Sequence, residues 1–503
     1  MKTRIVSTRI PIGQTDGTYN ISLPTGFGVP RGFLVYAMDN FVQPNNFDSD
    51  TDFPCISVGF GGSNTAGTAI TNACVFLSSA EAVTSAVRSS FGNTVSVFTT
   101  NQALSVRRQW WMTGFGQDII FGQFQSVGTQ ISPLDLAFTV FGGDDFSCAI
   151  GQVAMPATIG AIVNVTTTFQ PDAMFYSGMR PVQTTDGNIN FGVAVRDAAA
   201  GSTNVITQVS SAWRNVNATT TTDCQARLIT DSTWNLSTNA QIRATYMGPA
   251  GVGFSQSTTS TANSVLFMAM KAGTGLSTNP TFAAGTFQSP TGTGNTYYAV
   301  GFKPEHIIGS FSHLSALNTL ANTSAGGADM ISYFTANGFQ KSNIVGIGTF
   351  TSSTSSTTVT GVGTSFLNQL GAIDTIYNQN YQLVGIVSSI TSNTSLLLQS
   401  NAAITATGSS FVFEKPQQFS FSYGNPDASA VGSTNHRGYV SDNAIVSFLA
   451  TTPTLQAVGN ITNLNGENGF NVNYSTLVTG SRFGWYFAIR DEDFYNRRRG
   501  SVS

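Results

Sequence analysis

The chain has 503 residues and a formal net charge of −3, from 22 basic and 25 acidic side chains, and no basic stripe of the kind that nucleic-acid-binding proteins place against phosphates. Only 9% of its residues are charged, which disfavours long solvated helices, and 41% are apolar, which excludes a disordered chain. We therefore expect an all-β protein of several domains, with Gly- and Asn-rich turns and no nucleic-acid partner.

An aromatic-x-Pro motif followed by a short apolar strand recurs along the chain, at residues 27–35 in a looser form and then at 169–176 and 302–309. After each copy comes a strand in which small and apolar residues alternate, which is typical of a half-buried sheet. We identify these strands at residues 55–60, 189–195 and 419–423, with further strands at 74–76, 224–228 and 437–440.

The repeat predicts tandem antiparallel β-sandwich or jelly-roll-like modules with few short helices. Residues 264–270 and 482–489 are similar apolar strands that would close two of the modules. The expected boundaries are 1–125, 126–276, and a discontinuous third module of 277–340 and 416–503. Residues 114–122 resemble part of a repeat, and they fit equally the closing hairpin of the first module.

Two segments have helical signals. In residues 78–91, Ser78 and Glu81 form a capping-box pattern, and Val83, Val87 and Phe91 recur on one helical face. Residues 311–320 show a weaker pattern of the same kind. Both are expected to be short helices at a sandwich edge.

A small all-β unit interrupts the third module at residues 341–415. Its strands are indicated by Ser and Thr alternating with Val and Phe, and Asn393 is expected in a turn between two strands. The unit contains the runs STTVTGVGTSF at 356–366 and SITSNTSLLL at 389–398. An exposed loop of a host domain is the usual site of such an insertion.

These two runs resemble a small β-module that recurs as an insert in structural proteins of tailed bacteriophages. The resemblance departs at one point, since residues 372–374 read Ala-Ile-Asp where that module has Gly-Asp before an apolar residue. The aromatic-x-Pro modules also resemble β-sandwich units of phage tail and head-surface proteins. The resemblance implies a place in the virion rather than a chemistry, because such inserts occur on tails, fibres and capsids alike.

Candidate sites are few. Residues 48–52 read Asp-Ser-Asp-Thr-Asp, the opening of a calcium loop, but Phe53 and Gly59 stand where such loops need Gly and Glu. We interpret this segment as a surface loop, and residues 185–188 as a turn. Glycoside hydrolysis needs two facing carboxylates, and no pair stands out by spacing among Asp144, Asp145, Asp223, Asp231, Glu467 and Asp491.

The three histidines, His306, His313 and His436, have no nucleophile partner in the sequence and are expected to be loop or sheet residues. The four cysteines, Cys55, Cys74, Cys148 and Cys224, lack metal-site spacing and are expected to be reduced and buried. We predict no catalytic residue, no cofactor and no metal. No apolar run reaches the roughly 18 residues of a membrane span, so membrane insertion is not expected. Residues 1–7 show no apolar core of signal-peptide length, so export is not expected either.

Two clusters are candidate protein interfaces. Arg107, Arg108, Trp110 and Trp111 form the densest aromatic and basic group, which suits a contact surface if exposed and a core Trp beside an edge Trp if buried. Arg497, Arg498 and Arg499 follow an acidic run at the end of the chain and suit a contact with a neighbouring subunit. A solvated chain end is the main alternative, and a contact with DNA or lipid is a weaker one.

The sequence thus favours a non-enzymatic structural protein of a tailed-phage virion, assembled in the host cytoplasm from contacts with other virion proteins and copies of itself. A tail-associated role is favoured, as a tube-surrounding, adaptor or fibre protein. A head-surface or vertex decoration protein is the first alternative. An adhesin that binds a host receptor or glycan is the second.

Overall fold

The computed structural model of the chain is almost entirely β. It describes residues 1–503 except for 40–54, 80–86, 93, 101–105, 128–132, 180–185, 197–205, 217–223, 231, 236–239, 258–262, 273–280, 313, 319–320, 323–329, 371–374, 425–436, 450–453, 467, 478–479 and 491–503. The described residues contain one helix, α1 (Phe366–Gln369), and all their sheet pairings are antiparallel apart from a single isolated bridge. The predicted all-β class is confirmed.

The first module is a sandwich of two sheets. The larger has the order β1-β11-β4-β5-β6-β7, and the smaller has the order β2-β10-β9-β8 with β3 also on β10. The strands are β1 (Lys2–Ile10), β2 (Gly17–Thr18), β3 (Ile21–Ser22), β4 (Pro30–Asp39), β5 (Cys55–Ser63), β6 (Ile70–Ser79), β7 (Val87–Gly92), β8 (Val97–Thr100), β9 (Val106–Gly116), β10 (Ile119–Ser126) and β11 (Leu134–Gly142).

The second module repeats this plan. Its larger sheet has the order β12-β21-β14-β15-β16-β17, extended by β25, and its smaller sheet has the order β13-β20-β19-β18. The strands are β12 (Ser147–Ala154), β13 (Val163–Val165), β14 (Ala173–Met179), β15 (Asp186–Arg196), β16 (Ile206–Val216), β17 (Cys224–Ile229), β18 (Thr233–Asn235), β19 (Ala240–Gly248), β20 (Gly251–Gln256), β21 (Ser264–Lys271) and β25 (Ala321–Asn322).

The third module repeats it again. Its larger sheet runs β22-β38-β24-β26-β33 with β34 on β33, and its smaller sheet runs β23-β37-β36-β35. The strands are β22 (Phe282–Gln288), β23 (Gly294–Ala299), β24 (His306–Ser312), β26 (Met330–Val345), β33 (Phe411–Gly424), β34 (Arg437–Ser441), β35 (Ile445–Leu449), β36 (Thr454–Gly466), β37 (Gly469–Leu477) and β38 (Phe483–Ile489).

The aromatic-x-Pro motif marks the same strand in all three modules. It precedes β4, β14 and β24, and each of these strands pairs with the last strand of its own module, β11, β21 or β38. The last strand in turn pairs with the first, β1, β12 or β22. Because β11 (Leu134–Gly142) pairs with β1 and β4, it belongs to the first module. The first module therefore extends beyond residue 125, the boundary expected from the sequence.

One detail of the repeat differs from the sequence interpretation, and one alternative that it left open is decided. Residues 419–423 lie in β33, which corresponds to β6 and β16 rather than to β5 and β15, because β26 comes between the motif strand and β33. Residues 114–122 form the turn and flanking strands of the β9–β10 hairpin. They are thus a hairpin within the first module and not an extra repeat.

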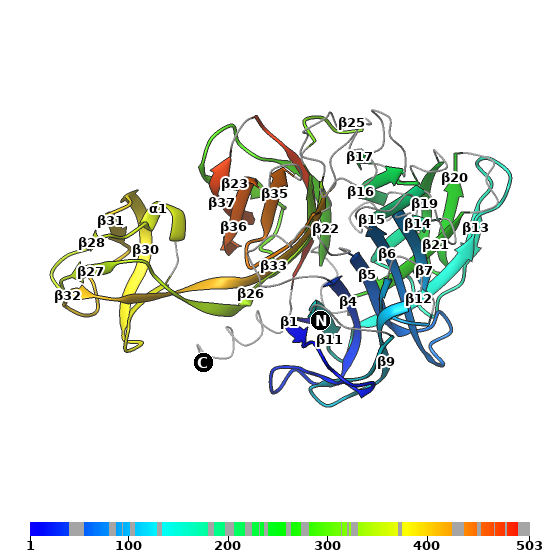
Figure 1. The fold of residues 1–503 in the computed structure, drawn as a ribbon, viewed down its shortest axis with the longest axis horizontal. Coiled ribbons are helices and arrows are strands. Elements are labelled where there is room, and N and C mark those ends of the chain that lie inside the picture. Colours follow the sequence, from blue (N-terminus) through cyan, green and yellow to red (C-terminus); the bar gives the residue numbers. More distant parts are fainter. Residues whose placement is uncertain are drawn as a thin grey trace.

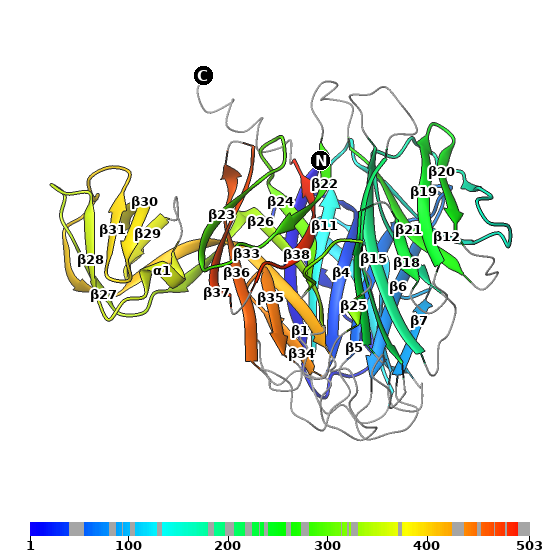
Figure 2. The same ribbon diagram turned by 90° about the horizontal axis from the view of Figure 1, so that it is seen from above.

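The larger sheets of the three modules share one hydrophobic core. This core contains residues from all three modules, among them Tyr36 of β4, Phe191 of β15 and Tyr333 of β26. The rings of Tyr36 and Tyr333 stack at 5.7 Å, and Phe191 meets Tyr333 edge-on at 5.5 Å. The smaller sheets close separate cores within each sandwich, and Figures 1 and 2 show the three sandwiches grouped around the common centre.

The insert projects from the third module on the two longest strands of the chain, β26 and β33, as Figures 1 and 2 show. It has its own hydrophobic core. Besides α1 it contains β27 (Thr349–Ser352), β28 (Thr358–Val362), β29 (Thr375–Asn378), β30 (Leu383–Ser392), β31 (Ser395–Leu398) and β32 (Ala406–Ser409). Asn393 lies in the turn between β30 and β31, as predicted.

Both predicted helices are wrong where the structure describes them. Ser78 and Ser79 end β6 and residues 87–92 form β7, while residues 80–86 lie outside the described part. The apolar spacing of Val83, Val87 and Phe91 is even, so it fits the period of a strand as well as that of a helix. In the second segment β24 ends at Ser312, and Asn318 has a left-handed φ of 58°, which an α-helix does not accommodate.

Candidate functional site

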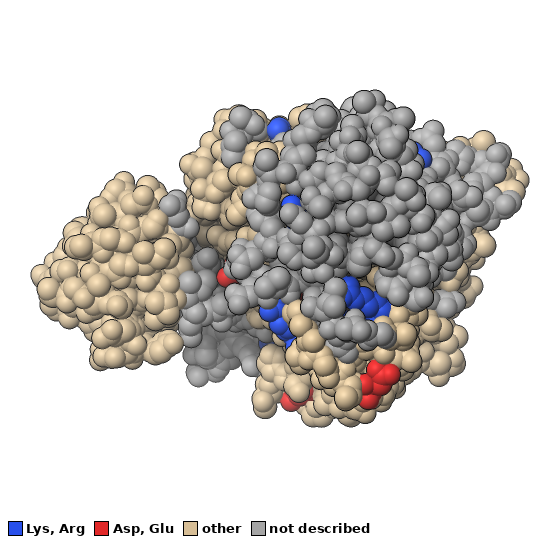
Figure 3. Space-filling view, in the orientation of Figure 1, with Lys and Arg blue, Asp and Glu red and all other residues tan. Residues whose placement is uncertain are grey.

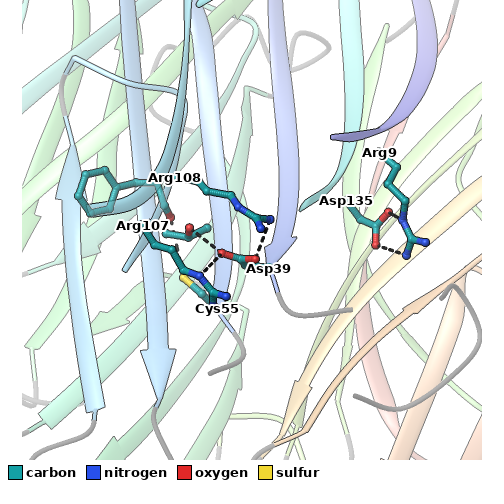
Figure 4. Close-up of polar contacts among 8 residues, drawn as sticks. Arg9, Asp39, Cys55, Arg107, Arg108 and Asp135 are labelled. Carbon is teal, nitrogen blue, oxygen red and sulfur yellow. Dashed lines mark hydrogen bonds and ion pairs between the residues drawn. The ribbon is translucent and has the colours of Figure 1, made fainter. Parts of the chain in front are cut away.

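The arginines of the first predicted interface are buried beneath the surface of the first module. Arg108 donates from a terminal guanidinium nitrogen to Asp39 Oδ1 at 3.0 Å, and Arg107 Nε lies 3.7 Å from Asp39 Oδ2. Thr99 donates its hydroxyl to the same carboxylate at 2.9 Å. Figure 4 shows the arginines converging on Asp39. Burial lowers the pKa of Arg108, and the negative charge of Asp39 opposes this shift.

The sequence left two arrangements open for the tryptophans, and the structure has the one with a core Trp beside an edge Trp. Trp110 is fully buried, packs edge-on against Phe33 and Phe138, and donates its indole N–H to the carbonyl of Tyr19 at 2.9 Å. Trp111 is half-buried on the other face of β9. Arg107, Arg108 and Trp110 are therefore enclosed within the module and present no exposed contact surface, so the buried alternative holds for them. Arg497, Arg498 and Arg499 lie outside the described residues.

Most of the remaining carboxylate candidates lie outside the described residues. Asp144 and Asp145 are exposed neighbours in one turn, whereas Asp223, Asp231, Glu467, Asp491 and residues 48–52 lie outside the described part. Residues 186–188 are in β15 and not in the predicted turn, since their backbones pair with β16. Within the described ranges, no group of three His, Cys, Asp or Glu side chains lies close enough to hold a metal ion.

Cys55, Cys74 and Cys148 are buried and free, as expected, and burial raises the pKa of the Cys74 and Cys148 thiols to about 12. Burial also raises the pKa of Cys55. The side chain of Cys224 lies outside the description. These thiols are therefore protonated packing groups and not nucleophiles.

The buried His306 belongs to a polar network that joins the third module to the first. Its Nε2 lies 2.7 Å from Thr335 Oγ1, and its Nδ1 lies 3.1 Å from the side-chain nitrogen of Asn337. Asn337 also donates to the backbone carbonyl of Thr3 at 3.1 Å. Because an amide nitrogen donates, His306 Nδ1 accepts and its Nε2–H donates to Thr335. His306 thus lies in a strand, β24, where it joins the two modules, and the expectation of a loop or sheet residue is confirmed.

A pocket of about 270 Å³ opens at the seam between the first and third modules. It is lined by Ser7, Thr8, Arg9, Asp135 and Leu136 from the first module and by Phe419, Phe421, Val440, Ser441 and Asp442 from the third. Arg9 and Asp135 form a two-pronged ion pair, with nitrogen–oxygen distances of 2.8 and 2.9 Å (Figure 4). The hydrogen bond to Asp135 raises the pKa of Arg9.

Sequence reasoning did not find this pocket. Arg9 and Asp135 are 126 residues apart, and only the pairing of β1 with β11 brings them together. Complementary charges at matching positions of two paired strands could have indicated them, but neither β1 nor β11 was predicted from the sequence.

The insert has a largely uncharged surface with several exposed apolar side chains. Of the fifteen large apolar side chains that are exposed in the described residues, seven lie in the insert: Val345, Ile347, Val362, Leu367, Tyr381, Leu383 and Ile386. Residues 341–415 contain just four charged residues, Lys341, Asp374, Glu414 and Lys415. The side of the insert seen in Figure 3 is tan, without blue or red side chains.

The insert is also held against the body of the protein. Asn473 of β37 donates from its side-chain nitrogen to the carbonyls of Leu367 and Leu370, at 3.2 Å each, at the short helix α1. Asn473 is only 4% exposed. The insert therefore has a defined orientation relative to the third module.

Comparisons with known proteins give no match for this chain, either among models of protein families or among curated sequences. In the described part of the chain, no helix has the length and apolarity needed to cross a membrane.

Proposed function

We propose that this chain is a non-enzymatic structural component of a tailed-phage virion that acts through protein–protein contacts, in a tail-associated position as a tube-surrounding, adaptor or fibre protein. The observation that carries the proposal is the insert, which resembles a recurrent phage module and projects from the three-sandwich body on β26 and β33. Its position leaves most of its surface available to a neighbouring protein.

The insert surface suits such a contact. Val345 and Leu383 are exposed and lie on one face of the sheet, where the buried Val412 and the half-buried Tyr377 are paired between them. Ile386 on β30 is also exposed. Few charged groups need to lose water when this surface is covered, which favours association.

The experiment that tests this proposal measures how much of the chain is incorporated into phage particles. Particles are purified on a density gradient from a lysate of the phage whose genome encodes the chain, and the chain is quantified by mass spectrometry. The double variant Leu383→Ser/Ile386→Ser is expected to lower incorporation at least about tenfold, since buried apolar anchors at interfaces are worth about 2 kcal/mol or more.

The control is Ile159→Ser/Ile162→Ser, which removes two side chains of similar exposure from the second module and should incorporate normally. Absence of the unaltered chain from mature particles would sink the proposal. Equal incorporation of both double variants would mean that the exposed apolar side chains of the insert do not contribute to incorporation.

Two other functions remain as alternatives. A head-surface or vertex decoration protein would use the same contacts at another place on the particle, so antibody labelling of intact particles separates it from a tail protein. A receptor- or glycan-binding adhesin predicts that the isolated chain binds host cells and competes with phage adsorption. A purified chain that cleaves a host glycan would instead place the protein among enzymes.

A further inference from the structure

Each of the three modules turns one face of its larger sheet toward its own core and the other face toward the core that all modules share. Counting from the proline of the aromatic-x-Pro motif aligns β4, β14 and β24. The third residue after the proline lies in the separate core of its own module: Phe33, Met174 and Ile307. The fourth residue lies in the shared core: Leu34, Phe175 and Ile308. Because successive side chains of a strand point to opposite faces, the three sheets face the shared core in the same way.

The neighbouring strands β5, β15 and β26 are equivalent as well. The pairing of the fourth residues gives three equivalent partners on these strands: Phe60, Val193 and Thr335. Two residues before these partners, on the same face, the three equivalent side chains are fully buried in the shared core: Val58, Phe191 and Tyr333. Of these, Phe191 and Tyr333 touch, with ring centroids 5.5 Å apart. Residues related by a rotation come this close only near its axis, so a pseudo-threefold axis passes through the shared core.

The seams between the modules are also equivalent, and they close into a ring. The first strand of the second module, β12, packs on β5 of the first module, and the first strand of the third module, β22, packs on β15 and β16 of the second. The first strand of the first module, β1, packs on β26 of the third. Since β5, β15 and β26 are equivalent strands, the third seam repeats the first two and returns to the starting module.

Polar contacts cross the two seams that follow the order of the chain. Between the first and second modules, the thiol of Cys148 donates to the carbonyl of Arg31 at 2.8 Å. Between the second and third modules, Ser211 accepts from the indole N–H of Trp485 at 3.2 Å and donates to the hydroxyl of Ser310 at 3.0 Å. Each module is thus fastened to the next one by buried groups.

The third seam joins modules that lie at opposite ends of the sequence, and it is fastened in the same manner. The hydroxyl oxygens of Thr139 and Thr335 lie 2.9 Å apart, and Asn337 donates to the carbonyl of Thr3 at 3.1 Å. Thr335 and Asn337 belong to β26, whereas Thr3 and Thr139 belong to β1 and β11. The first module is therefore held by the third as directly as by the second.

We propose that the three-sandwich body is a closed ring that takes the place of a homotrimer within one chain, so that no second copy of the chain binds along its seams. In a cyclic homotrimer each subunit fills the seam of the next, and every feature occurs three times. Here one chain fills all three seams, and the insert occurs once, between β26 and β33. Contacts with neighbours are left to the insert and the outer surface. The place of the ring in an assembly rests on the proposed structural function, whereas the closure of the ring does not.

The test cuts the folded full-length chain between the first and second modules, where residues 143–146 alone join β11 to β12. A recognition site for a sequence-specific protease is inserted between Asp144 and Asp145, which are exposed. Size-exclusion chromatography with light scattering at serial dilution then measures whether the two pieces stay together. The cut chain is expected to keep the mass of one intact chain, because two seams hold the first module.

The decisive comparison weakens one seam at a time in the cut chain. Thr335→Val removes the hydrogen bond to Thr139, so the first module should separate at a concentration about tenfold higher, while Thr335→Ser should behave as the unaltered chain does. Thr139→Val removes the same bond from the other side and should act alike, so the result does not depend on the folding of one variant. Ser211→Ala is the matched control, because its hydrogen bonds cross the seam between the second and third modules. It should leave the separation unchanged.

Two results would overturn the ring. Separation that is equal in the unaltered cut chain and in both Val variants would mean that the third seam does not hold the first module. A dimer or trimer of the uncut chain that persists in Leu383→Ser/Ile386→Ser would mean that copies bind through the body. A monomer, or self-association that this variant abolishes, agrees with a closed body. All these measurements use the purified chain, so its absence from phage particles would refute the virion role and leave the ring intact.

Discussion

The side-chain oxygens of Thr139 and Thr335 lie 2.9 Å apart, so a hydrogen bond between two buried hydroxyls joins the last strand of the first module to β26 of the third. Thr335 also accepts from His306 Nε2 at 2.7 Å. The contact between these modules is therefore polar as well as hydrophobic, and a polar contact of this kind specifies one arrangement of the modules.

Thr335→Val keeps the shape of the side chain but removes both hydrogen bonds. It is expected to destabilise the folded chain by about 2 kcal/mol, because buried polar groups of Thr139 and His306 lose their partner. Chemical denaturation measures the loss. Thr335→Ser retains the hydroxyl and should lose clearly less stability, and a Ser variant as unstable as the Val variant would assign the effect to packing.

The same network predicts a pH dependence. Burial, and then the positive charge of Arg4, lower the pKa of His306 from 6.5 to about 3. The unfolded chain binds this proton near pH 6.5 and the folded chain does not, so the stabilising contribution is complete above pH 6.5 and is lost as the pH falls toward 3. His306→Gln has no proton to gain.

The difference in unfolding free energy between the unaltered chain and His306→Gln should therefore be largest at neutral pH and shrink as the pH falls below 6.5. Subtracting the two curves cancels the titration of carboxylates that both proteins share. A difference that is constant from pH 8 to pH 4 would contradict a neutral, buried His306.

Asn473→Ala is expected to loosen the insert. The substitution removes the two hydrogen bonds to the carbonyls of Leu367 and Leu370, so amide exchange at α1 should accelerate and the radius of gyration from X-ray scattering should rise. Asn471→Ala changes a partly exposed neighbour on the same strand and should have no such effect. Unchanged scattering and exchange in Asn473→Ala would mean that the ribbon of β26 and β33 alone fixes the insert.

Trp110→Ala and Trp111→Ala should differ strongly although the residues are adjacent. Trp110 is fully buried and its loss should destabilise the chain by about 3–5 kcal/mol, as expected for a large aromatic side chain removed from a core. Trp111 is half-buried, so its loss should be much milder. Thermal unfolding compares them, and similar destabilisation would contradict the packing of β9.

Composition and strand periodicity predicted the fold class, the repeat and the insert, because these depend on local sequence. They did not predict the partners of single side chains. The Arg-Arg-x-Trp-Trp pattern indicates a dense cluster, but only the partner strand and the position of Asp39 decide that Arg108 and Trp110 face inward. The helix predicted for residues 78–91 was wrong for a related reason, because the pairing of β6 with β7 overrides a local helical signal.

The candidate site was hidden from the sequence for a topological reason. The seam pocket needs β1 and β11 from the two ends of the first module and β33 and β34 from the third, with the insert between β26 and β33. No local pattern spans such distances.

An asymmetric cryo-electron microscopy map of the intact particle tests the central claim most directly. The account predicts density for the three-sandwich body at the tail, with the insert in contact with a neighbouring protein through the face of Val345 and Leu383. A well-resolved map of mature particles in which no density fits this chain would contradict it.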